Sequence, residues 1–579
     1  MTFFQQPPTL GNTYRSDTVL REHLERLLPP ELLAQLEPEL DAMGAAAAGE
    51  LARLAERAEA APPRVIRFDP WGRRVDRIEV SPAWDELVAA QARAGMVAVA
   101  YDGAFGAHGR TVQHALLHVY APSSAVATCP LAMTDAAVRV LLDHSQPELR
   151  ERVVPLLTSR DPGRAWTSGQ WMTEREGGSD VGRTATVARL DDRGRWRLHG
   201  TKWFTSATTA DCALALARPD GAAAGSKGLG LFLVELVDPL TGEPQLGSTI
   251  LVNRLKDKLG TKALPTAELT LEGAVATPVG GIEAGLKKIT GMLNVTRLHN
   301  AISAAAGMRR GVELAVAYAR VREAFGHRLG DLPLHRETLV QLAVEAEAAF
   351  ALVARAAELL GRAEHGTAAP LEQAALRALV PVVKLLTGKD AVAHASEVVE
   401  AFGGAGYIED TGVPRLLRDA QVLPIWEGTT NVLSLDLARA ERTDGAVTAL
   451  LGDLDGRLPQ RSDATAGAER ATGLDRAREL VARSRDALAK DLSGWGELDA
   501  AVLQAHLRAF AMRLGRTYAA GLLVAHAAGR LEDREAGGGH AAAAAARYAG
   551  RWLGSPPPAP PTAAEIAMSE ELLATVIRP

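Results

Sequence analysis

The feature that most constrains the fold is the order of helix-like and strand-like segments along the chain. Residues from about 160 to 280 read as short strands, whereas the stretches on either side read as long helices. Within the strand-like part, 184–190 and 196–199 flank the turn residues 191–194, a pattern typical of a β-hairpin. Because no long helix separates these strands, we expect an antiparallel sheet or barrel.

The flanking stretches carry Ala and Leu at three- and four-residue spacing, as in packed helices. Ser16 is the expected N-cap of an early helix, and 64–81 alternate in polarity like a small hairpin. The expected helices are 83–97, 110–121, 134–144 and 147–157 on one side, and 284–323, 335–363, 370–402 and 430–441 on the other.

We therefore predict an α+β chain that is mostly α. The expected domains are an N-terminal helical domain (1–158), a central β-sheet or barrel domain (159–282), a C-terminal helical bundle (283–444) and a helical C-terminal extension (445–579).

Charge and cysteine content exclude several classes of protein. The formal net charge of −6 gives no general attraction to nucleic acid or anionic lipid. Cys129 and Cys212 are the two cysteines, which argues against a disulfide framework and favours a reducing compartment. No apolar run approaches a bilayer span, and the first residues lack a signal-peptide pattern. We expect a cytoplasmic protein without membrane contact.

Two motifs in the strand-like region suggest a bound ligand. The stretch 172–180 (MTEREGGSD) contains two adjacent glycines that permit close backbone approach, with hydroxyls nearby. Taken alone, it reads more simply as an ordinary turn. The stretch 202–206 (KWFTS) combines aromatic rings and hydroxyls, which suits a flat ring but equally suits a sheet core.

Two motifs at helix ends have similar alternatives. Arg322, in 322–326 (REAFG), offers a guanidinium that clamps a pyrophosphate or simply ends a helix. The stretch 401–407 (AFGGAGY) allows close backbone approach or is a plain glycine C-cap. His114 and His118 have a zinc-compatible spacing, but a helix face with two histidines is the simpler interpretation, and we expect no metal site.

Glu427 is the candidate base. It lies between Trp426 and Gly428, directly after the apolar segment 422–425. Removal of water from one side of a carboxylate raises its basicity, and the glycine leaves the other side accessible.

Together these five motifs resemble, in order and context, those of the acyl-CoA dehydrogenase family of flavoproteins. The resemblance covers about 80–441. The Gly-Gly-Ser-Asp segment preceded by Arg175-Glu176, the segment 254–260 (RLKDKLG), and 68–74 (FDPWGRR) are similar to the AidB branch of that family, the bacterial alkylation-response relatives. With the extra C-terminal helices, the resemblance extends over nearly the whole chain.

The resemblance implies an FAD site and a homo-oligomer, in this family usually a tetramer, because part of the FAD would be held by a neighbouring subunit. Arg322, Phe325, Glu400 and Gly404 match that shared adenine part. The implied cofactor-binding residues are Met172, Thr173, Ser179, Phe204, Thr205, Ser206, Arg322, Phe325, Glu400, Gly404, Thr429 and Asn431.

The resemblance also implies a reaction. Glu427 would remove the proton alpha to the carbonyl of an acyl-CoA thioester while hydride passes from the beta carbon to flavin N5. Some relatives place the base on a bundle helix, where this chain has Thr296, which is no carboxylate. Arg175, Glu176 and Trp203 depart from ordinary members and suggest weak activity or an unusual acyl group.

The alternative hypothesis is a flavoprotein that binds DNA and protects it from alkylation, with vestigial dehydrogenase activity. In the AidB branch DNA binding is attributed to the C-terminal extension. Residues 451–579 carry equal numbers of basic and acidic residues, so only a local stripe would serve. The arginines of that stripe are Arg476, Arg478, Arg483, Arg485, Arg508, Arg513 and Arg516; a solvated helix face of mixed charge is the simpler interpretation.

Overall fold

The structure, a computed structural model, describes residues 5–459, 468–532, 538–556 and 562. Its contacts group into two compact units. The N-terminal unit comprises Leu10–Ala306 and Glu409–Asp419, and the C-terminal unit comprises Met1–Thr9, Gly307–Ile408 and Ala420–Pro579. The four-domain division is finer than these units and stays a prediction.

Within the described residues, helices α1 to α7 precede the barrel strands of the N-terminal unit, and the four helices expected between 83 and 157 are confirmed. The expected cap of the first helix was wrong by one residue. Asp17, not Ser16, accepts a hydrogen bond from the Leu20 amide at 3.1 Å. The helices are α1 (Thr18–Leu27), α2 (Pro30–Ala48), α3 (Glu50–Ala60), α4 (Pro82–Arg93), α5 (Gly109–Tyr120), α6 (Thr128–His144) and α7 (Pro147–Leu157).

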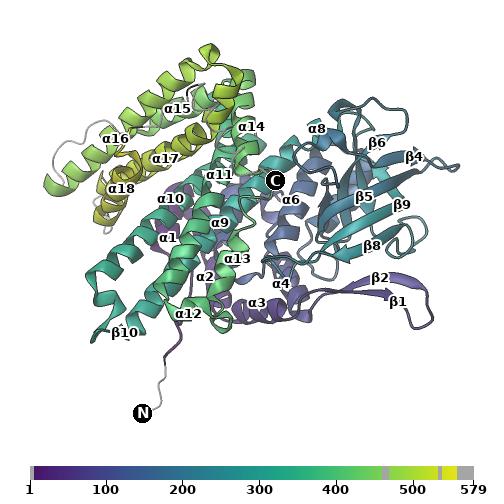
Figure 1. The fold of residues 1–579 in the computed structure, drawn as a ribbon, viewed down its shortest axis with the longest axis horizontal. Helices are drawn as coiled ribbons and strands as arrows, with labels where there is room; N and C mark the ends of the chain where they lie inside the picture. The colour runs from purple at the N-terminus through teal and green to yellow at the C-terminus, as the bar shows by residue number, and fades with distance from the viewer. Residues whose placement is uncertain (1–4, 460–467, 533–537, 557–561, 563–579) are drawn as a thin grey trace, which may run out of the picture. The chain divides into compact units, whose positions relative to one another are not determined.

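Between α3 and α4, the strands β1 (Arg64–Phe68) and β2 (Arg74–Glu79) form the expected small hairpin. It is visible as the purple ribbon that lies alongside β8 in Figure 1.

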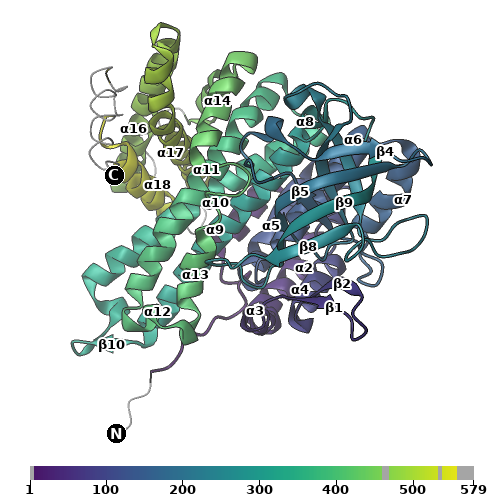
Figure 2. The same ribbon diagram turned by 45° about the vertical axis from the view of Figure 1, so that its right-hand side comes forward.

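The β-sheet of the N-terminal unit closes on itself. β6 pairs with β4 and β7, and the path β4–β5–β9–β7 completes the ring, with β3 attached to β6 and β8 to β9 (Figures 1 and 2). The pairings are antiparallel except β3–β6 and β4–β6, which are parallel. The strands are β3 (Ser168–Trp171), β4 (Val187–Leu190), β5 (Trp196–Ser206), β6 (Cys212–Pro219), β7 (Gly230–Glu235), β8 (Ile250–Leu255) and β9 (Thr266–Pro278).

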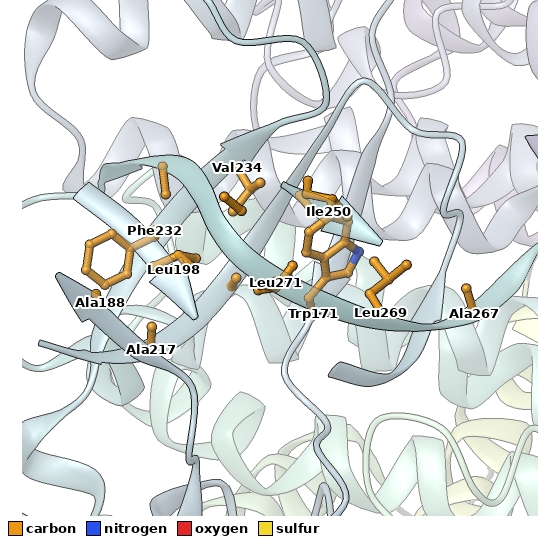
Figure 3. Close-up of a cluster of buried hydrophobic side chains, with 14 of the residues drawn as sticks. Trp171, Ala188, Leu198, Ala217, Phe232, Val234, Ile250, Ala267, Leu269 and Leu271 are labelled. Atoms are coloured by element: carbon orange, nitrogen blue, oxygen red, sulfur yellow. The ribbon is translucent and has the colours of Figure 1, made fainter. Parts of the chain in front are cut away.

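The interior of the barrel is apolar (Figure 3). Trp171, Phe232 and Leu271 are buried there together with small residues such as Ala213 and Ala215. Each fully buried large side chain contributes about 1.5–3 kcal/mol of transfer free energy. This core makes the barrel a rigid support for residues on its outer surface.

The C-terminal unit is helical. Helix α11 (Pro370–Ala401) packs against α10 (Pro333–Glu364) and α14 (Thr430–Asp444), and the second half of α9 (Thr290–Val321) approaches α11 closely at Gly311. The four long helices expected from 284 to 441 are thus confirmed. Four further helices, α15 (Ala446–Arg457), α16 (Ala468–Ser493), α17 (Ala500–Glu532) and α18 (Gly538–Leu553), form the extension. Residues 460–467, 533–537, 557–561 and 563–579 of the predicted extension lie outside the described residues.

A buried cation fastens the extension to α10. The Arg355 guanidinium is almost inaccessible and pairs with Asp453 of α15 at 2.5 Å and with Glu358 at 2.8 Å. Asp453 in turn accepts a hydrogen bond from Tyr518 of α17. Buried charges require such partners, so this network fixes how α15 and α17 pack on α10.

No helix in the described ranges has the length and apolar character needed to cross a bilayer.

Candidate active site

A β-bulge on the barrel surface presents two aromatic rings. The β5–β9 register shifts between Lys202 and Thr205, so Trp203 and Phe204 lie in an irregular stretch. Phe204 is 49% exposed, unusual for a large apolar ring on a sheet. Thr205 is buried and donates its hydroxyl to the Ala267 carbonyl at 2.9 Å. Phe204 is therefore accessible to a ligand, whereas Thr205 serves the sheet.

A lysine covers both rings. The Lys256 ammonium lies 3.8 Å from the centroid of Trp203 and 4.4 Å from that of Phe204. Glu268 holds the same ammonium at 2.6 Å. Arg175 lies 5.5 Å from Trp203, so the indole has two cations beside it.

Ser206 begins a short chain of polar groups. Its hydroxyl lies 3.1 Å from the Thr266 hydroxyl, which accepts from the Lys258 ammonium at 3.2 Å. Burial lowers the pKa of Lys258 to about 8. Lys258 also donates to the Thr261 and Leu264 carbonyls, which keeps this side chain in place.

The 172–180 loop is held by one carboxylate. Glu174 accepts from the Lys202 ammonium at 2.7 Å, from the Ala185 amide at 2.7 Å and from the Thr186 hydroxyl at 2.5 Å. Burial opposes the charge on Glu174, but Lys202 and these hydrogen bonds outweigh it and lower its pKa. Burial also lowers the pKa of the fully enclosed Lys202, against the effect of Glu174. The pair joins the loop to β5.

The candidate ligands of this loop differ in accessibility. Met172 is buried, Thr173 is half-buried, and Ser179 is exposed. The Thr173 carbonyl accepts from the Trp203 amide at 2.9 Å, so the loop and the bulge are side by side. Immediately after Ser179 lies an open cavity of about 540 Å³, lined by Asp180, Gly182, Arg183, Thr184, Arg218, Ala224, Gly225 and Ser226.

In the C-terminal unit, Glu427 occupies a strained backbone conformation. Its φ is +56°, in the left-handed region that non-glycine residues avoid, and Gly428 follows with φ +104°. Glu427 is half-buried. Such conformations persist only where the surroundings impose them, and they gather at functional sites.

Helix α11 imposes this conformation. The Lys384 ammonium, fully buried, donates to the Gly428 carbonyl at 2.5 Å. One turn later, Gly388 leaves room for the loop, since a Cβ there would lie 3.1 Å from the Leu423 carbonyl. A buried lysine and a glycine on one helix face thus hold the segment that ends in Glu427.

Helix α14 begins directly after this loop. Thr429 is its N-cap residue and is exposed, and its side chain makes no capping hydrogen bond. Asn431 is exposed and accepts from Arg508 at 3.2 Å. The free amides of this helix start favour a negatively charged group.

The remaining candidates lie together at the far end of α11. Phe325 and Gly326 form the two-residue turn of the hairpin β10 (Glu323–Ala324) and β11 (His327–Arg328), both with positive φ. Phe325 is 92% exposed, and Arg322 is half-buried. The stacked rings of Tyr318 and Phe402, 4.4 Å apart, bring this hairpin beside the Gly404 loop.

One helix separates these two groups within a chain. Glu400 follows Lys384 by 16 residues in α11, which corresponds to about 24 Å along the helix axis. The structure therefore brings Glu427, Thr429 and Asn431 together, and Arg322, Phe325, Glu400 and Gly404 together, but keeps the two groups apart.

Family models match almost all of the chain up to residue 441. They are the adaptive response protein AidB N-terminal domain (5–162), the acyl-CoA dehydrogenase middle domain (169–274) and the acyl-CoA dehydrogenase C-terminal domain (283–441).

Individual relatives extend the match. Acyl-CoA dehydrogenase family member 11 of Caenorhabditis elegans is 41% identical over 545 residues, covering 91% of this chain and 86% of that protein. The chain belongs to the acyl-CoA dehydrogenase family. The putative acyl-CoA dehydrogenase AidB of Escherichia coli is 34% identical over 468 residues, covering 78% of this chain and 82% of that protein.

A solved structure agrees. The crystal structure of Caenorhabditis elegans ACDH-11 in complex with C11-CoA has a TM-score of 0.92 at 37% identity, covering all of this chain and 97% of that one. This acyl-CoA dehydrogenase family member is therefore an enzyme of a family that uses FAD.

Each unit offers described residues that fit one part of FAD. The exposed Phe204 ring beside Trp203, with the Ser206 and Thr266 hydroxyls next to it, suits a flat polar ring system. The exposed Phe325 and nearby Arg322 suit an aromatic base with phosphates.

The seven candidate DNA-contacting arginines of this family member separate into three sets. Arg516 is buried, and Arg513 donates to Ser484 at 2.7 Å and to the Trp552 carbonyl at 3.1 Å, so both serve internal packing. Arg476, Arg483 and Arg508 are exposed. Arg478 and Arg485 are half-buried and lie beside carboxylates.

Sequence reasoning missed the groups that position the site. Lys384, Lys256 and Lys258 are not in any motif that suggested a ligand, and Glu174 was noted only as part of a loop. One signal was present, because Lys384 interrupts the apolar run 382–386, and such a lysine needs a buried partner.

Proposed function

We propose that this chain is an FAD-dependent acyl-CoA dehydrogenase in which Glu427 removes the proton alpha to the carbonyl of an acyl thioester. The observation that carries the proposal is the left-handed backbone at Glu427, held by Lys384 at a helix start. A base held in one position, rather than on a free loop, gives the close approach that proton transfer requires.

The surrounding residues have distinct roles in this proposal. Met172, Thr173, Ser179, Phe204 and Ser206 bind the flavin side, and Thr429 and Asn431 bind the cofactor next to the base. When bound, FAD supplies the acceptor for the hydride that leaves the beta carbon. We expect the half-buried Trp426 to exclude water from one side of Glu427.

The substrate class rests on the relatives. ACDH-11 was solved with C11-CoA, and an acyl-CoA thioester provides the acidified C–H that a carboxylate base needs. Arg175 beside Trp203 adds bulk and charge on the barrel surface, so we propose an acyl group other than the common straight chains.

We further propose a homo-oligomer, with a tetramer as the expected size. The separation of about 24 Å along α11 between Lys384, which holds the Glu427 loop, and Glu400 supports this, because the Arg322 group is then available to the FAD of a neighbouring copy.

The test is anaerobic titration of the purified FAD-loaded protein with a panel of acyl-CoA thioesters, followed at the flavin absorbance. The wild type should bleach, and Glu427→Gln should bleach at least about 100-fold more slowly. The variant should still bind FAD and acyl-CoA, because the glutamine side chain has nearly the same shape as the glutamate that it replaces. Bleaching at the wild-type rate in Glu427→Gln would remove Glu427 as the base.

Binding to double-stranded DNA is the second candidate. Its support is the exposure of Arg476 and Arg483, seven residues apart on α16, and of Arg508 on α17. A salt-sensitive gel shift that is lost in the triple variant R476Q/R483Q/R508Q would support it. No shift with the wild type at low salt would overturn it.

A further inference from the structure

The β1–β2 hairpin, here called the arm (residues 64–79), is fixed to the barrel through residues close to its turn. Asp76, fully buried and left-handed, accepts from the Val252 amide of β8 at 2.8 Å. Arg67 donates to the Val252 carbonyl at 2.7 Å and to the Asn253 carbonyl at 2.5 Å. A Cβ at Gly247 would overlap the Val75 backbone, so the barrel also approaches the arm there. The arm is therefore a rigid projection of the barrel.

The tip of the arm is preorganised around Asp69. Its carboxylate accepts from the Trp71 and Arg73 amides, both at 2.9 Å, and its backbone pairs with that of Arg73. This turn displays the Trp71 ring, which is 93% exposed, with Phe68 more than half exposed beside it. Two exposed aromatic side chains on one fixed turn form a small apolar patch, and such patches are common at interaction sites.

The charge of the arm indicates the partner. It carries five arginines and three carboxylates, a net charge of +2, in a chain whose formal net charge is −6, so the rest of the chain carries −8. We propose that the arm docks onto a second copy of this chain, with Trp71 as the anchor and the arm's arginines facing carboxylates of the other copy. Trp and Arg are the residues that most often dominate binding at protein interfaces.

The pairing of the arginines favours a protein over a nucleic acid. Arg64 and Arg77 share Glu79 at 2.7 and 2.9 Å, and Arg73 lies 3.3 Å from Asp69. Nucleic acid binding requires a stripe of cations that can neutralise successive phosphates, whereas each of the five arm arginines lies beside a carboxylate of the arm. An arm that carries arginines beside carboxylates is better suited to short-range contacts with individual side chains of an acidic protein surface.

The inference rests on the oligomer proposed above and is tested by sedimentation velocity of the full FAD-loaded chain over a range of concentrations. Trp71→Ala should raise the dissociation constant of assembly by about 30-fold or more. Trp71→Phe keeps an aromatic anchor, so its dissociation constant of assembly should rise much less. Leu240→Ala removes another large exposed side chain of the same unit, and should leave assembly unchanged.

The outcomes separate the two proposals. A wild type that is monomeric at every concentration would overturn both the oligomer and the arm contact. An oligomeric wild type with an equally oligomeric Trp71→Ala variant would overturn the arm contact and leave the oligomer standing. Thermal unfolding and flavin absorbance of Trp71→Ala should match the wild type, since Trp71 is 93% exposed.

Discussion

At the scale of single residues, Glu427 shows how a site can hold a catalytic group at a cost to stability. A non-glycine residue in the left-handed region costs about 1–2 kcal/mol. The Lys384 ammonium on the Gly428 carbonyl and the close approach of Gly388 oppose relaxation of that segment. The strain is thus offset by contacts made through α11, away from the reacting atoms.

The first prediction concerns Lys384→Met. Loss of the hydrogen bond to Gly428 should free the loop and displace the Glu427 carboxylate, and a displacement of about 1 Å can cost 100-fold in rate. We expect kcat for flavin reduction to fall by about 10- to 100-fold while the affinity for acyl-CoA changes little.

The matched control is Thr387→Val, also buried on α11, whose hydroxyl donates to the Val383 carbonyl at 2.8 Å and not to the loop. It should lower the melting temperature without changing kcat. Equal kcat losses in the two variants would mean that Lys384 only supports packing.

At the scale of structural elements, the decisive contact in the barrel is between a loop and a strand. Glu174 and Lys202 join the 172–180 loop to β5, one residue before the bulge that presents Trp203 and Phe204. Two elements that both carry candidate flavin contacts are therefore set by one buried ion pair.

The second prediction is that Lys202→Met destabilises the N-terminal unit by about 3–5 kcal/mol, because Glu174 is left as an uncompensated buried charge. FAD affinity should fall as well, as the loop loses its fixed position. Denaturant unfolding and FAD titration measure the two effects.

The comparison is Glu176→Gln, which breaks the exposed Arg183–Glu176 pair of the same loop. An exposed pair contributes about 0–1 kcal/mol, so this variant should unfold like the wild type. A Lys202→Met protein of wild-type stability and FAD affinity would show that the loop is held by other means.

At the scale of the whole molecule, stability in the C-terminal unit depends on pH. Arg516 of α17 joins Asp390 of α11 at 2.5 Å and Glu345 of α10 at 3.4 Å, and lies 3.6 Å from the Trp552 ring of α18. Burial and the neighbouring Glu345, opposed by Arg516, raise the pKa of Asp390 to about 6. The Arg516 guanidinium thus pairs with two buried acids at the place where α10, α11, α17 and α18 meet.

The third prediction follows from the sign of that shift. Between pH 4 and 6 the folded chain holds a proton on Asp390 that the unfolded chain has lost, so this group's contribution to stability falls as the pH rises through that window. A shift of two units corresponds to about 3 kcal/mol. Urea unfolding of the wild type relative to Asp390→Asn should change by about 1–3 kcal/mol between pH 4 and 6.5.

Asp444→Asn, an exposed acid at the end of α14, is the control and should show the wild-type pH dependence. If the stability of Asp390→Asn changed with pH as that of the wild type does, the pH dependence would belong to groups other than Asp390.

The sequence by itself determined the helix, strand and helix order, most element positions and the family. Local spacing carries this information: the 184–199 hairpin, the glycines at 177–178 and 403–404, and the Trp-Glu-Gly segment are each readable within a few residues. Propensity and periodicity act over short range, which is why the Ser16 cap was wrong by only one residue.

Tertiary structure decided which groups hold those motifs in place. The lysines at 202, 256 and 384 meet partners 28, 12 and 44 residues away in sequence, and such distances follow no local pattern. Three further features also follow no local pattern in the sequence. They are the closure of the barrel through parallel pairings of β6, the left-handed backbone of Glu427, and the internal contacts of Arg513 and Arg516. Each depends on burial, and burial exists only once segments distant in the chain have packed together.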